Sequence, residues 1–392
     1  MRRPPASILA HLLALAALIA APLGCSTALP NYGSRPRAAI DAAVSPLDEP
    51  LPVPVITLAG APGEIGAQHG AALHEQIKLL EEKYLNPRLG DGSRKVLALA
   101  AASLFVTKIS PAHMQEIRSL AEASNLDPRT ALLAQCFLDL TNSIACSTIA
   151  LPASASPDGV PRLGRNLDFP SMDVLDKVSV VMVYRPAGAF EFVAIGWPGL
   201  IGVVSGMNEH GLTLSNMEVP REPRFPSAMP YPLLYRTILE RCRTVDEAIQ
   251  FLEDTPRQSA NNLTLMDGAG NRAVVEIKPE SIAVRRGVDD QPLISTNHQR
   301  GQDADTPGRC WRYDSLRAAS TTSFGELDVR KIESMLAHAQ QQDFTIQSMV
   351  IEPSRRVMYL SFGKNAASRK FYRFDLNKQF TRPLSPAVAG AH

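Results

Sequence analysis

The sequence has almost no excess of charge of either sign. Among its 392 residues, 40 Lys and Arg stand against 39 Asp and Glu, which gives a formal net charge of +1. A polyanion-binding surface normally needs a clear basic excess, so nucleic acid is not an expected partner. Aromatic residues make up only 6% and hydrophobic residues 45%, a composition typical of an ordinary globular protein rather than a disordered or multi-span membrane protein.

Metal-binding signatures are also missing. The chain contains no Cys-x-x-Cys pair and no His-Glu-x-x-His motif, and its 8 histidines show no ligand spacing, so we expect neither a metal nor another cofactor. Of the 5 cysteines, Cys136 and Cys242 end or interrupt apolar helical stretches and are expected to be buried. A disulfide between Cys242 and Cys310 is one pairing that the sequence allows in an exported protein.

The longest apolar run is too short to cross a bilayer. It extends from Ile8 to Ala21 behind Arg2 and Arg3, which predicts a secretory signal peptide over residues 1–24 rather than a membrane span of about 20 residues. Residues 22–26 resemble a bacterial lipobox, with Pro22 where leucine is usual, so we expect lipidation of Cys25 and a membrane-anchored lipoprotein facing the periplasm or the cell exterior. Ordinary cleavage and export as a soluble protein is the alternative.

Four further regions follow the signal. Residues 25–54 are rich in proline and alanine and predict a spacer. Residues 55–145 are mostly helical in pattern, and His69 lies on the apolar face of the first helix, where a packed and hydrogen-bonded histidine is favoured over a ligand. Residues 146–380 consist mainly of short apolar runs between turn signals, and 381–392 form a tail. The predicted strands in this large region are 178–184, 190–195, 200–205, 211–219, 261–267, 272–277, 346–351 and 356–361.

Five segments in order carry a family resemblance. They are residues 60–70, 145–148, 164–169, 206–212 and 295–298. Together they resemble the acyl-coenzyme A:6-aminopenicillanic acid acyltransferase-like peptidases, which are N-terminal-nucleophile cysteine hydrolases distantly similar to bile-salt hydrolases, penicillin V acylases and acid ceramidase. The resemblance covers about residues 55 to 375. It implies an α+β fold, an αββα sandwich of two stacked, mainly antiparallel sheets flanked by helices.

The resemblance makes Cys146 the nucleophile and the Ala145–Cys146 bond the site of autocatalytic cleavage. Cleavage would give Cys146 a free α-amine beside its thiol. An α-amine titrates near pH 8 and can act as the base for a thiol whose usual pKa is about 8.5. The mature protein would then consist of a small helical chain and a large chain that begins at Cys146. Many relatives have glycine where this chain has Ala145.

The resemblance also places Arg165 near the thiolate, where it would lower the thiol pKa, and gives Asp168 a hydrogen bond to the Cys146 amine. A surface Arg–Asp pair is the alternative for these two residues. Strand residues three apart face opposite sides, so both can serve one site only if the backbone bends there.

Three more residues complete the candidate site. Asn297 matches an oxyanion-hole asparagine, and Asn216 matches another site asparagine, with turn capping as its alternative role. Arg312 matches a basic residue of the relatives, although Arg309 is an equal candidate by spacing and a surface charge is the alternative. Phe169 and Trp197 are candidates for an acyl pocket or for the core. Asn261 and Asn262 open a predicted strand and are expected to satisfy backbone groups rather than to act in catalysis.

The resemblance and the predicted export together favour a hydrolase. We expect cleavage of a linear N-acyl amide through an acyl thioester on Cys146, because an exported enzyme meets little acyl-coenzyme A. The alternatives are an N-acyltransferase that uses an acyl thioester donor and a non-catalytic lipoprotein that retains the fold. The expected partners are therefore the small-molecule substrate, the membrane through Cys25, and the protein's own small and large chains.

Overall fold

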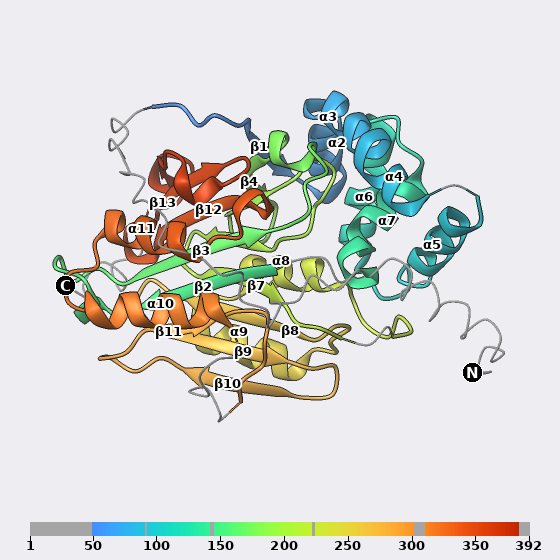
Figure 1. Cartoon of the computed structure of the whole chain (residues 1–392). Helices are drawn as coiled ribbons and strands as arrows, with labels where there is room; N and C mark the ends of the chain where they lie inside the picture. Colours follow the sequence, from blue (N-terminus) through green and yellow to red (C-terminus); the bar gives the residue numbers. More distant parts are fainter. Residues whose placement is uncertain (1–48, 91, 142–144, 222–223, 302–309, 384–392) are drawn as a thin grey trace.

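The computed structural model describes residues 49–90, 92–141, 145–221, 224–301 and 310–383. The predicted signal peptide, Cys25 and nearly all of the spacer lie outside these ranges. Within them, the strands form two sheets, and nearly all neighbouring strands are antiparallel (Figure 1).

The first sheet has eight strands. In this sheet only β1 and β4 are parallel neighbours, and the connection between them in the chain includes the helical segment. In spatial order the strands are β1 (Val55–Gly60), β4 (Val180–Pro186), β5 (Phe192–Gly196), β6 (Ser205–Asn208), β7 (Thr213–Glu218), β8 (Asn261–Met266), β9 (Arg272–Ile277) and β10 (Ile282–Arg286).

The second sheet has six strands and carries the candidate nucleophile. In spatial order they are β11 (Leu293–Ser295), β2 (Ala145–Leu151), β3 (Arg162–Asp168), β12 (Thr345–Glu352), β13 (Val357–Phe362) and β14 (Tyr372–Asp375). Side chains alternate across β2: Thr148 hydrogen-bonds Thr264 of the first sheet, whereas Ile149 packs against the helices on the other side. Cys146 therefore shares the face of Thr148, between the sheets.

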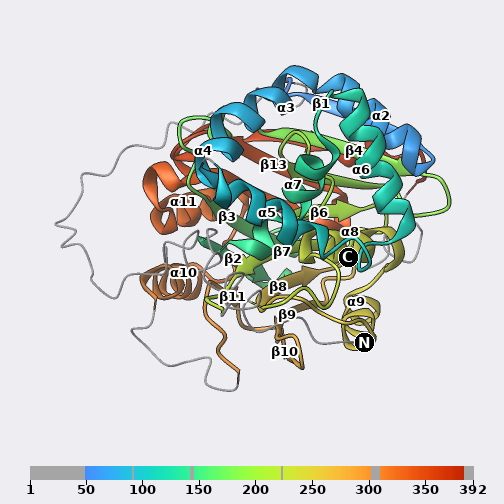
Figure 2. The ribbon, with the colours of Figure 1, turned by 90° about the vertical axis from the view of Figure 1, so that its right-hand side faces the viewer.

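Helices cover the outer face of each sheet. Figure 1 shows α2 to α7 gathered at the right of the molecule and α10 and α11 at the left, and Figure 2 shows α8 and α9 on the side opposite α10 and α11. The first sheet is covered by α2 (Pro62–Ala72), α3 (His74–Leu80), α4 (Asn86–Leu89), α5 (Ser93–Ser103), α6 (Pro111–Ala123), α7 (Pro128–Leu140), α8 (Tyr231–Arg241) and α9 (Val245–Asp254). The second is covered by α10 (Trp311–Thr322) and α11 (Val329–Ala339).

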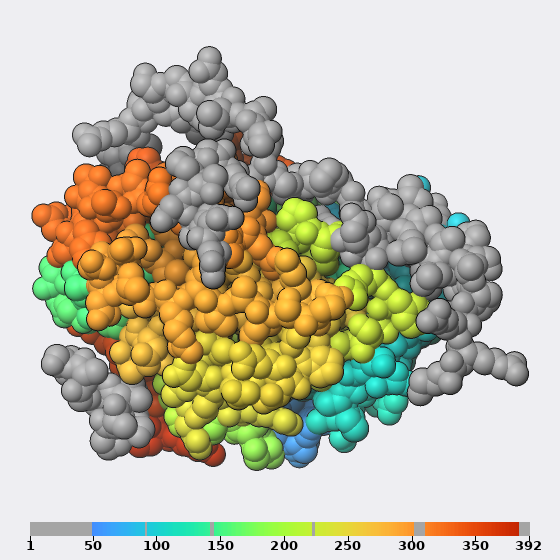
Figure 3. Space-filling view, turned by 90° about the horizontal axis from the view of Figure 1, so that it is seen from below, coloured from blue at the N-terminus to red at the C-terminus, as the bar shows by residue number. Residues whose placement is uncertain are grey.

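Three apolar clusters hold these layers together. One fills the space between the sheets, with Leu163 and Met349 from the second sheet against Val181 and Met207 from the first. The other two join each sheet to its helices. The order helix, sheet, sheet, helix is the predicted αββα sandwich, so the predicted fold class is confirmed. In the view from below, yellow and orange residues of the second half of the chain form a continuous face (Figure 3).

Some local predictions need correction. The strand predicted at 200–205 begins only at Ser205, since residues 200–204 form a buried connection. The disulfide between Cys242 and Cys310 is absent, and both residues are free thiols. They cannot pair because Cys242 belongs to the cluster outside the first sheet and Cys310 to the cluster outside the second. Among the described helices, none is long and apolar enough to cross a membrane.

A buried ion pair joins the helical segment to the large region. The guanidinium of Arg236 donates to both carboxylate oxygens of Glu116, at 2.7 and 2.8 Å, and also to Glu240. It lies over the ring of Tyr184 at 4.6 Å. Nearby, His69 accepts a hydrogen bond from Gly199 N, as its packed position predicted. These contacts connect α2 and α6 to α8 and the first sheet.

Removing one partner of this pair should destabilise the protein strongly. We expect Glu116→Ala to lower the free energy of unfolding by about 3–5 kcal/mol, because it leaves the Arg236 charge buried without its bidentate partner. Urea unfolding followed by circular dichroism measures the change. Glu122→Ala, at an exposed position of the same helix, is the control and should change stability by less than about 0.5 kcal/mol; equal losses in both variants would contradict the assigned role of the pair.

Candidate active site

Cys146 is the second residue of β2 and is fully buried. Both of its backbone polar groups bind side chains from distant parts of the chain. Its N–H donates to Asn297 Oδ1 at 2.9 Å, and its carbonyl accepts from Arg312 Nη1 at 2.6 Å. Arg312 Nη2 also donates to Asn297 Oδ1 at 2.8 Å. Two residues remote in sequence therefore fix the backbone on the carboxyl side of the predicted cleavage bond.

The thiol of Cys146 lies beside Arg165. Arg165 Nη2 is 3.7 Å from the sulfur, while Nη1 donates to the carbonyl of Asn216 at 2.7 Å. Burial raises the pKa of the Cys146 thiol to about 11, and the Arg165 charge opposes that effect without overcoming it. Arg165 thus lies beside the thiol and its charge favours the thiolate, but with this raised pKa the thiol is protonated at neutral pH in the uncut chain.

Asp168 faces the opposite side of β3, toward α10 and α11. Its carboxylate accepts from Arg312 Nη1 at 3.1 Å, Gln341 Nε2 at 2.9 Å and the Thr345 hydroxyl. Burial raises its pKa despite these partners. The surface-pair alternative is wrong, because Arg165 and Asp168 are both buried and have different partners.

No bend of β3 is needed to place these two residues. The register irregularity lies in the neighbouring strand, between Thr345 and Gln347 of β12, and Arg312 reaches around the strand end to join the two faces. The resemblance implied a hydrogen bond from the Cys146 amine to the Asp168 carboxylate. In this uncut chain the Cys146 N–H instead donates to Asn297, while the Asp168 backbone N–H hydrogen-bonds the thiol.

The two site asparagines differ in how their amides are used. Asn297 Nδ2 donates to the carbonyl of Glu218 at 2.6 Å, so its donor is engaged. Asn216 is fully buried within β7, and neither polar atom of its side chain has a hydrogen-bond partner among the described residues. Its turn-capping alternative is wrong: Asn208 caps that turn by accepting from the backbone of His210 and Leu212.

Arg312 is brought into the site, so the alternative of a surface charge is wrong for it. Arg309 lies outside the described residues. Asn262 behaves as predicted: its Nδ2 donates to the carbonyls of Thr296 and His298, at 2.9 and 2.8 Å, and so supports the backbone on both sides of Asn297. For Asn261 the prediction is wrong, because neither polar atom of its buried side chain hydrogen-bonds a backbone group among the described residues.

Sequence reasoning missed a second buried polar cluster next to the site. Asp139, near the end of α7, accepts from Tyr231 N at 3.0 Å and from the Ser259 hydroxyl. Arg221 lies beside Glu218 at 3.6 Å and donates to backbone carbonyls at the end of α7. Burial raises the pKa of Asp139 to about 7, although the Arg221 charge opposes this. No local motif marks these residues, because they come from separate segments of the chain.

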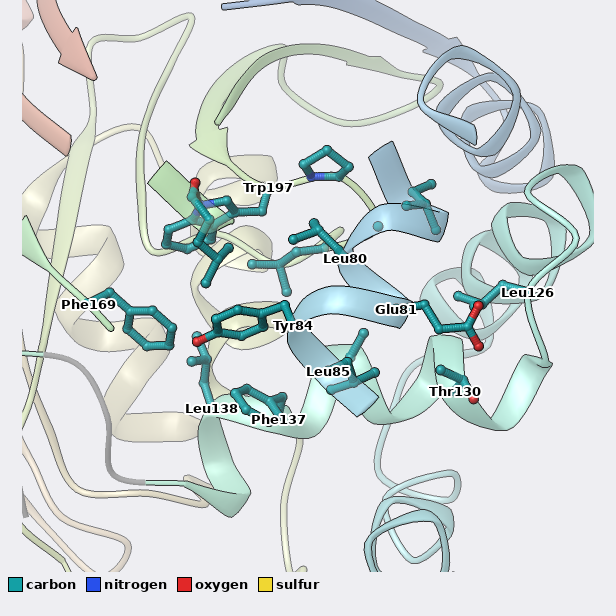
Figure 4. Close-up of a pocket in the computed structure, with 16 residues that line it drawn as sticks. Leu80, Glu81, Tyr84, Leu85, Leu126, Thr130, Phe137, Leu138, Phe169 and Trp197 are labelled. Carbon is teal, nitrogen blue, oxygen red and sulfur yellow. Dashed lines mark hydrogen bonds between the residues drawn. The ribbon is translucent and has the colours of Figure 1, made fainter. Parts of the chain in front are cut away.

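An apolar cavity of about 100 Å³ lies between the helical segment and the first sheet. Figure 4 shows Tyr84 between Phe169 and Phe137, with Trp197 and Leu80 above its ring and Glu81 and Thr130 toward the far end. The ring centroids of Tyr84 and Phe169 are 6.3 Å apart, and those of Phe169 and Trp197 are 5.8 Å apart. Phe169 and Trp197 therefore do line a cavity, and Phe169 directly follows the site residue Asp168.

A protein-family model identifies the family of this chain. Residues 155–367, more than half of the chain, match the family described as acyl-coenzyme A:6-aminopenicillanic acid acyl-transferase. The chain belongs to this family. The match begins after Cys146 and includes Arg165, Asp168, Asn216, Asn297 and Arg312. The family is named for an acyl-transfer activity.

Individual relatives of this family member are distant. An uncharacterized protein of Archaeoglobus fulgidus is 20% identical over 73% of this chain and 58% of its own length. The N-acylethanolamine-hydrolyzing acid amidase of Oryctolagus cuniculus is 28% identical over 38% of this chain and 42% of its own length. The chain thus spans about half the length of these curated relatives. The solved ortholog of that amidase from Caenorhabditis elegans aligns with 53% of this chain and 93% of its own, at 16% identity and a TM-score of 0.44.

Within the described ranges, no group of three or more His, Cys, Asp or Glu side chains could hold a metal ion. The polar groups around Cys146 are instead guanidinium, amide and carboxylate groups that bind one another. This arrangement can orient a nucleophile and stabilise charge with protein groups alone.

The raised pKa of Asp139 predicts a pH-dependent stability. The folded state binds this proton more tightly than the unfolded state, where the pKa is near 4, so stability falls as pH rises from about 4 to about 7. The comparison is made in a Cys146→Ala background, which is expected to keep the chain uncut. There, the loss of unfolding free energy between low and high pH should be smaller in Asp139→Asn, by about 4 kcal/mol at most, the equivalent of roughly three pKa units.

Urea unfolding at pH 4.5 and pH 8 measures that difference. Asp246→Asn, at an exposed position in α9, is the control and should leave the pH slope unchanged. An unaltered slope in Asp139→Asn would show that Asp139 titrates normally in the folded protein.

Proposed function

We propose that this protein is an exported, autoprocessing N-terminal-cysteine hydrolase of linear N-acyl amides. The observation that carries the proposal is the arrangement around Cys146: its thiol, its N–H and its carbonyl each have a separate side-chain partner in a buried site. Such specific bonding at one residue fits a backbone position at which a bond is made and broken. Family membership supports the same chemistry.

Maturation would proceed by attack of the Cys146 sulfur on the carbonyl carbon of Ala145. The Ala145–Cys146 C–N bond breaks, the nitrogen takes up a proton, and a thioester joins Ala145 to the Cys146 sulfur. Water then hydrolyses the thioester, which releases the Ala145 carboxylate and regenerates the thiol beside a new α-amine. Asn297 Oδ1, which already accepts from this nitrogen, is placed to hold the amine.

In turnover, the thiol would attack the carbonyl of the substrate amide while the α-amine takes the thiol proton and passes it to the leaving amine. The Arg165 guanidinium supplies a donor for the oxyanion, because its Nη2 lies 3.7 Å from the sulfur in the space between the sheets. The Asn216 side chain shares the helix-facing side of β7 with Leu214, so Asn216 contributes through its backbone carbonyl, which accepts from Arg165 Nη1 and holds the guanidinium in place.

The cavity lined by Tyr84, Phe169 and Trp197 is the proposed acyl site. Its lining is almost entirely apolar, which suits a hydrocarbon chain better than a polar side chain. The amidase relative is named for an N-acylethanolamine, and a lipid-like amide would suit an enzyme that Cys25 anchors to a membrane. The activity for which the family is named makes acyl transfer to an amine the second candidate.

Intact-protein mass spectrometry tests the maturation step. Residues 25–392 should yield two fragments, the larger starting at Cys146, whereas Cys146→Ala should give one uncut mass with the same fold by circular dichroism. A single mass for the unaltered chain would reject the hydrolase and favour a binding lipoprotein. If fragments form, release of amine from fluorogenic N-acyl amides, with and without added amine acceptors, distinguishes hydrolysis from transfer.

Loss of the Arg165 guanidinium should impair turnover. We expect Arg165→Met to lower kcat by about 10²–10³, the typical effect of removing one oxyanion donor, with a smaller change in KM. Arg162→Met is the matched control, because Arg162 is also buried on β3 but pairs with Asp158 and Glu352. Similar rates for both variants, after correction for the cleaved fraction, would exclude the oxyanion role.

A further inference from the structure

The end of α7 is held by a guanidinium from the large region. Arg221 lies three residues beyond β7, and its Nη2 donates to the carbonyls of Leu138 and Thr141, the latter at 2.7 Å. The last carbonyls of a helix have no partner within the helix, and a cation there is favourable. Thr141 precedes Cys146 by five residues. Arg221 therefore binds the backbone on the amino side of the predicted cleavage bond.

The carboxyl side of the same bond is tied to the same end of β7. Cys146 N–H donates to Asn297, and Asn297 in turn donates to the carbonyl of Glu218, the last residue of β7. The Glu218 carboxylate lies 3.6 Å from Arg221. Residues 218–221 are thus connected by hydrogen bonds to Thr141, through the Arg221 side chain, and to Cys146, through Asn297.

A third contact makes this support rigid. Asp139 accepts from the first backbone N–H of α8 at Tyr231 and from Ser259, and the Tyr231 hydroxyl donates to the Glu218 carboxylate at 2.9 Å. The terminus of α7 consequently cannot shift relative to β7 without breaking several buried hydrogen bonds.

We propose that Arg221 is a positioning residue for the cleavage of the Ala145–Cys146 bond. The reaction requires the Cys146 sulfur to meet a carbonyl carbon of its own backbone, and such steps depend steeply on the placement of the reacting atoms. Arg221 restrains the chain entering the bond while Asn297 and Arg312 restrain the chain leaving it. This inference rests on the proposed function, since it concerns the maturation step of that enzyme.

The test measures cleavage rates of folded precursor. The chain is refolded from urea, and the uncut fraction is followed by intact-protein mass spectrometry for the unaltered protein and for Arg221→Met, Arg221→Lys and Arg162→Met. Arg162 is the matched control: it is buried at the other end of β3 and pairs with Asp158 and Glu352, so its loss destabilises the fold without touching the site. Thermal unfolding of each variant in a Cys146→Ala background gives its stability.

We expect Arg221→Met to cleave at least 10-fold more slowly than the unaltered chain, and Arg162→Met to cleave at the normal rate once folded. Arg221→Lys should recover part of the rate, because an ammonium group can bind one or both carbonyls with a less favourable geometry. If Arg221→Met does not fold, Arg221→Gln takes its place, and a normal rate in that uncharged variant overturns the proposal.

Equal rates for Arg221→Met and the unaltered chain also overturn it, and leave the proposed enzyme intact. An unaltered chain that never cleaves rejects the proposed function itself, and the positioning role with it.

Discussion

The buried guanidinium of Arg312 is the interaction on which the rest of the site depends. It bonds the Cys146 carbonyl, the Asp168 carboxylate and the Asn297 amide oxygen, at 2.6 to 3.1 Å. The Cys146 carbonyl belongs to β2, the Asp168 carboxylate lies on the helix-facing side of β3, and Asn297 lies in the loop after β11. A planar cation with several fixed donors can satisfy all of them at once, which a lysine ammonium could not do with the same geometry.

Burial gives this site both its order and its low reactivity in the uncut chain. Desolvation raises the pKa of the Cys146 thiol and disfavours its charged form, and the nearby Arg165 compensates only in part. Before cleavage, the structure holds a protonated thiol next to fixed donors. A new α-amine at the same residue would supply both a base and a local charge, so the proposed maturation changes the electrostatics of the site as well as its access.

Buried arginines, as well as apolar packing, connect the helical part of the chain to the sheet-rich part. Arg236 binds Glu116 of the helical segment from α8, and Arg221 binds the end of α7 from beyond β7. In each case an arginine of the large region meets an acceptor of the small one. Contacts of this kind would survive cleavage of the Ala145–Cys146 bond, because none of them uses the bond that breaks.

The sequence alone determined the family, the layered fold class and six residues that the structure gathers around one buried point. These followed from short motifs and from periodic apolar patterns, which are local properties of the chain. It could not assign partners to those residues: Asn297 and Asp168 bond differently from the expectation, and the Asn216 side chain has no hydrogen-bond partner among the described residues. Their neighbours come from strands and loops far away in the sequence.

Tertiary structure also decided the matters that depend on burial and on which face a side chain occupies. It placed Cys242 and Cys310 on opposite sides of the sandwich, and it brought Asp139 and Arg221, which no motif marks, together at the end of α7. Hydrogen-bond partners and desolvation arise only when two sheets and their helices are stacked, so no reading of the chain in one dimension contains them.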